Sequence, residues 1–237
     1  SHFLATEEAL NVLKNGGNAV DAAVTAAFAL AVTQPRSGNI GGGGFMLISS
    51  ETKMKVVAID YREKAPAAAT RDMYLDSDGN VDVNLSRYSH KAAGVPGTVA
   101  GLVLALKEYG TISLAESLAP AIKLANEGFF VTPRFSKGIK NREERLKGWP
   151  SSRKVFFKEN GKPYEPGDLF VQKDLAATLQ RIADQGVNGF YKGETADLIV
   201  AEMQRGNGLM TLEDLADYQP VVRQPVHGTY RGYDIYS

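Results

Sequence analysis

The sequence predicts a mixed α+β fold in which helices pack on a sheet. Apolar residues recur at helical spacing through residues 4–32, and two short strand-like runs follow at 45–49 and 55–60. β-Branched and aromatic residues then crowd positions 221–236, after several further helical patterns. The order of two helices, a hairpin, several helices and then strands indicates a mixed α/β or α+β layout.

Composition limits the function classes. The 237 residues are 43% hydrophobic and 23% charged, which is typical of a globular protein, and 27 basic residues balance 27 acidic ones. A net charge of zero argues against a nucleic-acid partner. The absence of cysteine excludes thiol catalysis, zinc ribbons and iron–sulfur ligation, and we expect no cofactor. No run of about 18 apolar residues occurs, so we expect no membrane span.

The first two predicted helices are separated by a glycine pair. The pattern of Leu4–Asn15 ends at Gly16 and Gly17, because glycine adopts the left-handed conformation of a helix end without steric penalty. Asn18 can cap the next helix, Ala19–Val32, which is alanine-rich on nearly every face. A helix that is apolar all round is expected to be buried.

A run of four glycines, Gly41–Gly44, precedes the predicted hairpin of Phe45–Ser49 and Lys55–Asp60. A phosphate-binding loop would need a helix after the glycines and a Gly-Lys-Ser/Thr sequence, and neither occurs here. We therefore expect a tight turn at which the backbone passes close to another segment.

The middle of the chain is mainly helical. Thr98–Tyr109 has one apolar face, and Ser113 with Glu116 forms a capping box. Since proline inside a helix removes a hydrogen bond, Pro120 is expected at the first turn of a new helix.

Further helix signals follow, and strands end the chain. Helical patterns or caps occur at residues 132–133, 173–185, 194–205 and 211–214, whereas residues 70–90 look like a polar excursion and 148–152 like a weak joint. The final strands have no visible closing partner, so residues outside this sequence are expected to cover them.

The histidines and Ser1 are weak candidates for chemistry. His2, His90 and His227 are scattered without a second ligand at i+3 or i+4, so no metal site is expected, and His90 is interpreted as structural. An N-terminal serine can act as a nucleophile, but Ser1 leads into a helix, whereas such a nucleophile opens a strand, so that role is rejected. A start at Ser1-His2-Phe3 also shows no signal peptide, and suggests a piece of something longer.

Arg62 is the most interesting side chain. It follows directly on the second predicted strand, at a point where Pro66 stiffens the exit of the chain. A guanidinium group presents a planar fork that matches a carboxylate with two hydrogen bonds. Position alone favours a surface ion pair with a nearby acid over ligand binding. Glu63 could orient Arg62, although strand alternation predicts that the two side chains point apart.

Several motifs, in this order, resemble the γ-glutamyltranspeptidase family. The resemblance runs from the N-terminus to the end of the sequence, in the pattern of the family's large subunit. The motifs are Asn15–Ala23, Gly38–Phe45, Tyr61–Pro66, Gly94–Gly101, Pro120–Ala125, Gly189–Gly193, Leu212–Ala216 and Tyr230–Tyr233. Four glycines followed by the Tyr-Arg-Glu-Lys-Ala-Pro exit make the resemblance specific.

The resemblance implies a partial αββα sandwich of the N-terminal nucleophile hydrolases, with its sheets completed by residues outside this sequence. It implies cleavage of the γ-glutamyl amide of glutathione and related compounds, with transfer to water or to an amino-acid or peptide acceptor. The nucleophile would be the N-terminal Thr of the small subunit, cut from the same precursor. Residues 1–237 would be the N-terminal portion of the large subunit, an incomplete domain that is inactive alone and exported to the periplasm or outside.

The resemblance also gives Arg62 a role and leaves two alternatives open. Arg62 matches the family arginine that binds the α-carboxylate of the γ-glutamyl group, with Glu63 as a weaker second candidate. A glutaryl-type β-lactam acylase of the same superfamily would also present a carboxylate to Arg62. A degenerate, non-catalytic binding protein would lack the nucleophile beyond Ser237.

Overall fold

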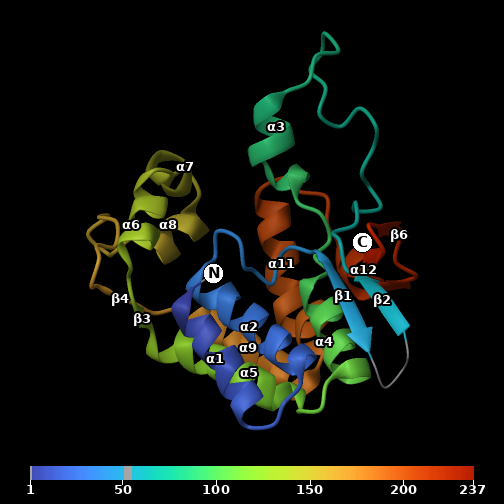
Figure 1. Ribbon diagram of the computed structural model, residues 1–237. Helices are drawn as coiled ribbons and strands as arrows, with labels where there is room; N and C mark the ends of the chain where they lie inside the picture. Colours follow the sequence, from blue (N-terminus) through green and yellow to red (C-terminus); the bar gives the residue numbers. More distant parts are fainter. Residues whose placement is uncertain (1, 51–54) are drawn as a thin grey trace.

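The computed structural model describes residues 2–50 and 55–237, so Ser1 and all but the first residue of the predicted hairpin turn at 50–53 lie outside the described residues. A layer of helices packs on a small sheet (Figure 1). The helices of this layer are α1 (Phe3–Lys14), α2 (Ala19–Thr33), α4 (Thr98–Tyr109), α5 (Leu114–Glu127) and α9 (Lys173–Gln185). The strands of the sheet are β1 (Phe45–Ser50), β2 (Lys55–Asp60) and β5 (Val221–Arg223). The predicted mixed fold, with helices on a sheet, is confirmed.

Helix α2 is the centre of the helical layer, as its composition predicts. Nine of its 15 residues are buried, and it contacts α1, α4 and α5. Phe28, Val24 and Val32 are fully buried in the main core. Alanine on the remaining faces lets the neighbouring helices approach closely, which explains why this helix shows little amphipathic character.

A buried carboxylate holds the start of α2 to the turn between α4 and α5. Asp21 is fully buried and completes the capping box with Asn18, whose backbone N–H donates to it at 2.7 Å. It also accepts from the Thr111 N–H at 2.7 Å, from the Thr111 hydroxyl at 2.6 Å and from the Ile112 N–H at 3.3 Å. Burial raises the pKa of Asp21, but the hydrogen bonds from Thr111, Asn18 and Ile112 together hold that pKa below its ordinary value.

The strands of the sheet lie in the order β1-β2-β5, and each pair of neighbouring strands is antiparallel. Ile48, Val57 and Ile59 are buried in the main core, where α4 contacts β2. Phe45 and Leu47 lie on the opposite face and are 64% and 48% exposed. This open face is where the second sheet of the expected sandwich would lie; that second sheet stays a prediction.

Helix α5 contradicts one expectation. Pro120 lies inside the helix, not at the first turn of a new one. The proline removes a hydrogen bond, but Leu118, Ala121 and Ala125 on the same helix are fully buried, and α5 contacts both α2 and α9. Tertiary packing therefore outweighs the local preference of proline.

An aromatic cluster joins a second group of helices to the core. Strands β3 (Phe129–Phe130) and β4 (Leu169–Phe170) pair there, and the rings of Phe129, Phe135, Phe156 and Tyr164 lie within 5.0 to 6.1 Å of Phe170. Helices α6 (Pro133–Lys140) and α8 (Pro150–Phe156) supply Phe135 and Phe156 to this cluster, and α7 (Glu143–Lys147) lies beside them (Figure 1). The predicted joint at 148–152 is the start of α8.

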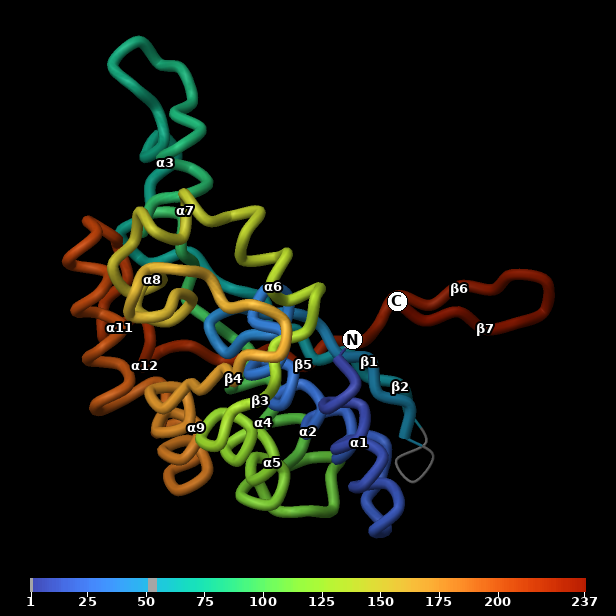
Figure 2. The backbone as a smooth tube through the Cα atoms, turned by 90° about the vertical axis from the view of Figure 1, so that its left-hand side faces the viewer, coloured from blue at the N-terminus to red at the C-terminus, as the bar shows by residue number. Residues whose placement is uncertain are grey.

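Two segments extend away from the body (Figure 2). The polar excursion after residue 70 carries the short helix α3 (Val83–Tyr88) and the 3-10 turn His90–Ala92, which the sequence patterns did not predict. The hairpin of β6 (His227–Tyr230) and β7 (Tyr233–Tyr236) projects on its own, as strands predicted without a closing partner would. The remaining helices are α10 (Asn188–Tyr191), α11 (Gly193–Arg205) and α12 (Leu212–Ala216).

The role of Asp21 gives a stability prediction. Asp21→Asn places an amide NH₂ among backbone and hydroxyl donors, so we expect the free energy of unfolding at pH 7 to fall by about 2–4 kcal/mol. Chemical denaturation measures this change. Asp197→Asn, on the exposed side of α11, is the matched control and is expected to change it by less than about 0.5 kcal/mol.

The same carboxylate contributes to acid sensitivity. Its folded-state pKa is lowered, so its stabilisation is complete above the unfolded pKa of about 3.9 and is lost as the pH falls through the folded value. The stability difference between the parent protein and Asp21→Asn should therefore shrink below about pH 4. A difference that stays constant down to pH 2.5 would show that Asp21 is not the titrating group.

Candidate functional site

Arg62 lies just past the end of β2, with its backbone fixed on both sides. Its N–H donates to Asp60 Oδ1 at 3.0 Å, and its carbonyl accepts from the Tyr218 hydroxyl at 2.8 Å. The side chain itself is 59% exposed. The backbone is thus held in place while the guanidinium group stays accessible, an arrangement suited to binding an anion from solution.

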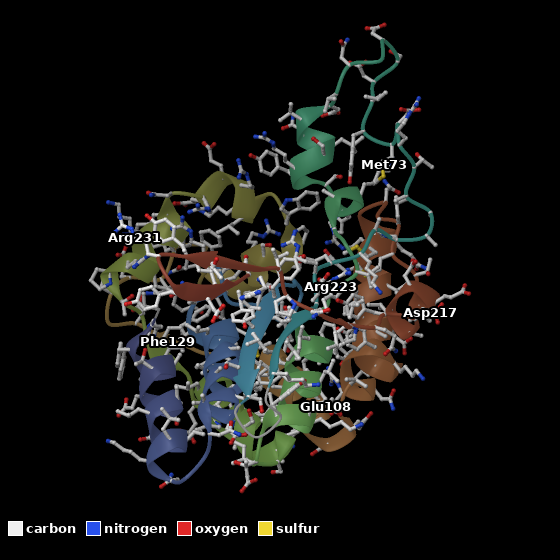
Figure 3. All side chains as sticks on the ribbon, turned by 45° about the vertical axis from the view of Figure 1, so that its right-hand side comes forward. Met73, Glu108, Phe129, Asp217, Arg223 and Arg231 are labelled. Atoms are coloured by element: carbon white, nitrogen blue, oxygen red, sulfur yellow. The ribbon has the colours of Figure 1, made fainter. Side chains whose placement is uncertain are left out.

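Asp60 is held by two positively polarised partners. Besides the Arg62 N–H, it accepts from Arg223 Nε at 2.8 Å, and Figure 3 labels Arg223 where β5 runs beside β2. The Arg62 N–H and the Arg223 guanidinium hold the pKa of Asp60 below its ordinary value. Asp60 therefore pairs with Arg223, and among the described residues no ion pair joins its carboxylate to the Arg62 side chain.

Glu63 differs from the prediction. Its carboxylate Oε2 lies 3.4 Å from Arg62 Nη1, so the two neighbouring side chains lie together and do not point apart. The reason is that β2 ends at Asp60, and the alternation of a strand no longer applies at Arg62 and Glu63. This Oε2 is buried and has no hydrogen-bond partner among the described residues, so the long ion pair leaves guanidinium donors free for a ligand.

The glycine run lies against this segment, as the tight-turn interpretation predicts. The Gly44 N–H donates to the Tyr61 carbonyl at 3.2 Å and the Tyr61 N–H donates back at 2.9 Å. A Cβ on Gly43 would lie 2.4 Å from the Tyr61 carbonyl oxygen and 2.9 Å from the Arg62 Cα. The Gly42 carbonyl accepts from the N–H groups of Gly97 and Thr98 at the start of α4. The glycines therefore allow three backbone segments to meet behind Arg62.

Two stacked tyrosines, Tyr218 and Tyr191, support the backbone at Arg62. Sequence patterns did not predict this role. Tyr218 and Tyr191 stack with ring centroids 5.7 Å apart, and the Tyr191 hydroxyl donates to the Pro96 carbonyl at 2.8 Å. Burial, with Asp60 and Glu63 nearby, raises the pKa of Tyr218 to about 12, so its hydroxyl stays a donor to Arg62. The sequence signals near Tyr218, the capping box of Thr211 and Asp214 and the motif Leu212–Ala216, give no role to Tyr218 itself.

The histidines play no part in this site. His90 Nε2 lies 3.0 Å from Glu202 Oε1, and its ring packs edge-on against Trp149 at 4.9 Å. His90 thus joins the excursion to α11 and to the start of α8, in agreement with a structural role. Among residues 2–50 and 55–237, no group of three or more histidine, aspartate or glutamate side chains could hold a metal ion. No helix in those ranges combines the length and hydropathy needed to cross a bilayer.

Comparisons with known proteins identify relatives of this chain. The sequence profile described as gamma-glutamyltranspeptidase matches residues 5–237. The glutathione hydrolase proenzyme of Escherichia coli (strain K12) is 51% identical over 234 residues, covering 98% of this chain and 40% of that protein. The crystal structure of Helicobacter pylori gamma-glutamyltranspeptidase superposes with a TM-score of 0.98 at 51% identity, covering all of this chain and 68% of that one.

The chain belongs to the γ-glutamyltranspeptidase family. It spans less than half the length of the E. coli relative. The chain is also similar to an acylase: the acylase ACY 1 proenzyme of Pseudomonas sp. (strain SE83) is 39% identical over 241 residues, covering 99% of this chain and 43% of that protein. The family match confirms the resemblance seen in the glycine run and in the exit segment Tyr61–Pro66. The role of Arg62 and Glu63 stays a prediction.

The glycine contact gives a prediction with a control in the same run. Gly43→Ala places a methyl group against the backbone of Tyr61 and Arg62, so we expect a loss of about 1–3 kcal/mol in the free energy of unfolding. Gly41→Ala meets nothing within 4 Å and should change it by less than about 1 kcal/mol. Equal effects of the two substitutions, measured by chemical denaturation, would contradict the close contact.

Proposed function

We propose that the whole protein cleaves γ-glutamyl amide bonds of glutathione and related compounds and transfers the γ-glutamyl group to water or to an amino-acid or peptide acceptor. Residues 1–237 would form the N-terminal portion of the large subunit, an incomplete domain. The observation that carries this proposal is Arg62, with a fixed backbone and an accessible guanidinium group, in a chain of this family.

In the proposed reaction, the Thr hydroxyl that begins the small subunit attacks the γ-carbonyl carbon of the donor. The hydroxyl proton passes to the leaving amine as the amide C–N bond breaks, and an ester between the Thr and the γ-glutamyl group remains. Water or an acceptor amine then attacks this ester and regenerates the hydroxyl. Arg62 contributes by holding the donor's α-carboxylate, which positions the γ-carbonyl for attack.

Glu63 would act through Arg62. Its carboxylate lies on one side of the guanidinium group at 3.4 Å and limits the orientations that the group can adopt. A guanidinium group held in this way loses less conformational entropy when it binds a carboxylate with two parallel hydrogen bonds. Glu63 is therefore proposed as a positioning residue.

The word proenzyme in the names of the relatives supports a precursor that is cut into two subunits. We propose that this protein cleaves itself, that the small subunit of the same precursor is the partner of this chain, and that the protein acts in the periplasm or outside the cell. The open face of the sheet, with Phe45 and Leu47 exposed, is consistent with a partner segment there.

A glutaryl-type acylase is the second candidate, favoured by the 39% identity to the acylase ACY 1 proenzyme. A glutaryl group also ends in a carboxylate and differs from a γ-glutamyl group by lacking the α-amine. Arg62 would bind either donor, so the α-amine decides between them. A third candidate, a non-catalytic binding protein, would turn over neither donor.

Donor choice is tested with the complete, processed protein and two matched substrates, γ-glutamyl-4-nitroanilide and glutaryl-4-nitroanilide. We expect release of 4-nitroaniline from the first at a kcat/KM at least about tenfold above the second. Preference for the glutaryl compound would establish the acylase, and turnover of neither would favour the binding protein. Purified residues 1–237 alone should release nothing.

The assignment of Arg62 is tested in the same assay. Arg62→Ala should mainly raise KM for γ-glutamyl donors. The resulting fall in kcat/KM should correspond to a loss of about 2–4 kcal/mol of transition-state stabilisation, since a charge-assisted contact with two hydrogen bonds is lost. Arg153→Ala, on exposed α8, is the matched control and should leave kcat/KM unchanged. An unchanged kcat/KM in Arg62→Ala would refute the binding role.

A further inference from the structure

A cavity of about 430 Å³ lies between the end of α2 and the group of helices α6, α7 and α8. One wall is the turn that follows α2, which includes Arg36. The other wall comes from Arg134 and Phe135 on α6, Arg142 just before α7, and Phe156 at the end of α8. Arg62 and Glu63 are not among its lining residues, so the cavity is distinct from the site described above.

The charged side chains that line this cavity are all positive. Three arginines, Arg36, Arg134 and Arg142, line it, and no aspartate or glutamate does. Within the described residues none of the three forms an ion pair, and the Arg142 guanidinium group makes only a 3.4 Å hydrogen bond to the Gly138 carbonyl. By contrast, the guanidinium groups of Arg181, Arg205 and Arg223 are each paired with a carboxylate. Three unpaired guanidinium groups around one hollow make its electrostatic potential positive and offer hydrogen-bond donors to an anion.

The inner surface is largely apolar and contains one unpartnered polar ring. Phe135, Ile139, Leu146 and Phe156 supply the apolar lining. His2 also lines the cavity, and both of its ring nitrogens are buried without a hydrogen-bond partner among the described residues. Its ring packs on Phe3 at 5.0 Å and on Phe129 at 5.6 Å; Figure 3 labels Phe129 beside α1. A buried imidazole without a partner is costly unless a ligand or water satisfies it.

The walls are held in place without a ligand. The Ser37 and Gly38 N–H groups donate to the Gln34 carbonyl at 3.0 and 2.9 Å, and a Cβ on Gly38 would lie 2.7 Å from the backbone of Leu30. On the other side, the Thr132 hydroxyl caps α6 by accepting from the Phe135 N–H at 3.2 Å. Because both walls are fixed by local hydrogen bonds, a ligand would find the cavity already formed.

We propose that this cavity binds an organic oxyanion: a carboxylate or phosphate attached to an aromatic or aliphatic body. Arg36, Arg134 and Arg142 hold the oxyanion. The side chains of Phe135, Leu146 and Phe156 contact the apolar body. The volume suits a ligand with one or two rings. The proposal does not depend on γ-glutamyl transfer, since it uses none of the residues around Arg62.

The test uses the complete, processed protein and two fluorescent probes that differ by one charged group. The anionic probe is 8-anilinonaphthalene-1-sulfonate, and N-phenyl-1-naphthylamine lacks its sulfonate. We expect saturable binding of the anionic probe, and an increase of about tenfold or more in its Kd in the double variant Arg134→Gln/Arg142→Gln. The Kd of the neutral probe should change less than twofold, which controls for folding and for apolar binding elsewhere.

Lys137→Gln is the matched control, because Lys137 lies on the same helix α6 but does not line the cavity. It should leave the Kd of the anionic probe unchanged. Displacement of this probe by 4-phenylbutyrate or by phenyl phosphate, but not by 4-phenylbutan-1-ol, would support the proposal and tell which oxyanion is preferred. Unchanged binding in the double variant, an equal loss in Lys137→Gln, or no saturable anion binding would overturn it.

Discussion

The arrangement around Arg62 depends on a close contact between backbones. Gly43 and Gly44 pack directly against Tyr61 and Arg62, and the Gly42 carbonyl accepts hydrogen bonds from the N–H groups at the start of α4. Any side chain at Gly43 would separate the glycine run from the end of β2. Because this contact joins the segment after α2, the exit of β2 and the start of α4, it determines where the guanidinium group leaves the protein surface.

Residues far apart in the sequence complete the support. Tyr218 donates to the Arg62 carbonyl across 156 positions, and Arg223 pairs with Asp60 across 163. Tyr218 lies just before β5 and Arg223 is the last residue of β5, so the pairing of β5 with β2 brings both into place. The result separates two roles: Asp60 and Tyr218 hold the backbone of Arg62, and its side chain keeps donors for a ligand.

The distribution of arginine pairing distinguishes structural from binding groups. Arg223 and Arg181 pair with Asp60 and Glu194, and these pairs connect β5 to β2 and α9 to α11. Arg62 has only a long contact with Glu63, whereas the arginines around the α6–α8 cavity have no carboxylate partner among the described residues. A guanidinium group without a carboxylate partner keeps its donors available for an anion from solution.

Local sequence determined the elements whose signals are local. The capping boxes at Ser113 and Thr211, the buried helix α2 and the hairpin strands all follow from spacing and side-chain chemistry, and they lie where predicted. The order of motifs also indicated the family and singled out Arg62. Tertiary structure alone decided that Pro120 stays inside α5, that Glu63 lies beside Arg62, and that Tyr218 supports the site. These outcomes depend on packing and hydrogen bonds between residues distant in sequence, which no local pattern encodes.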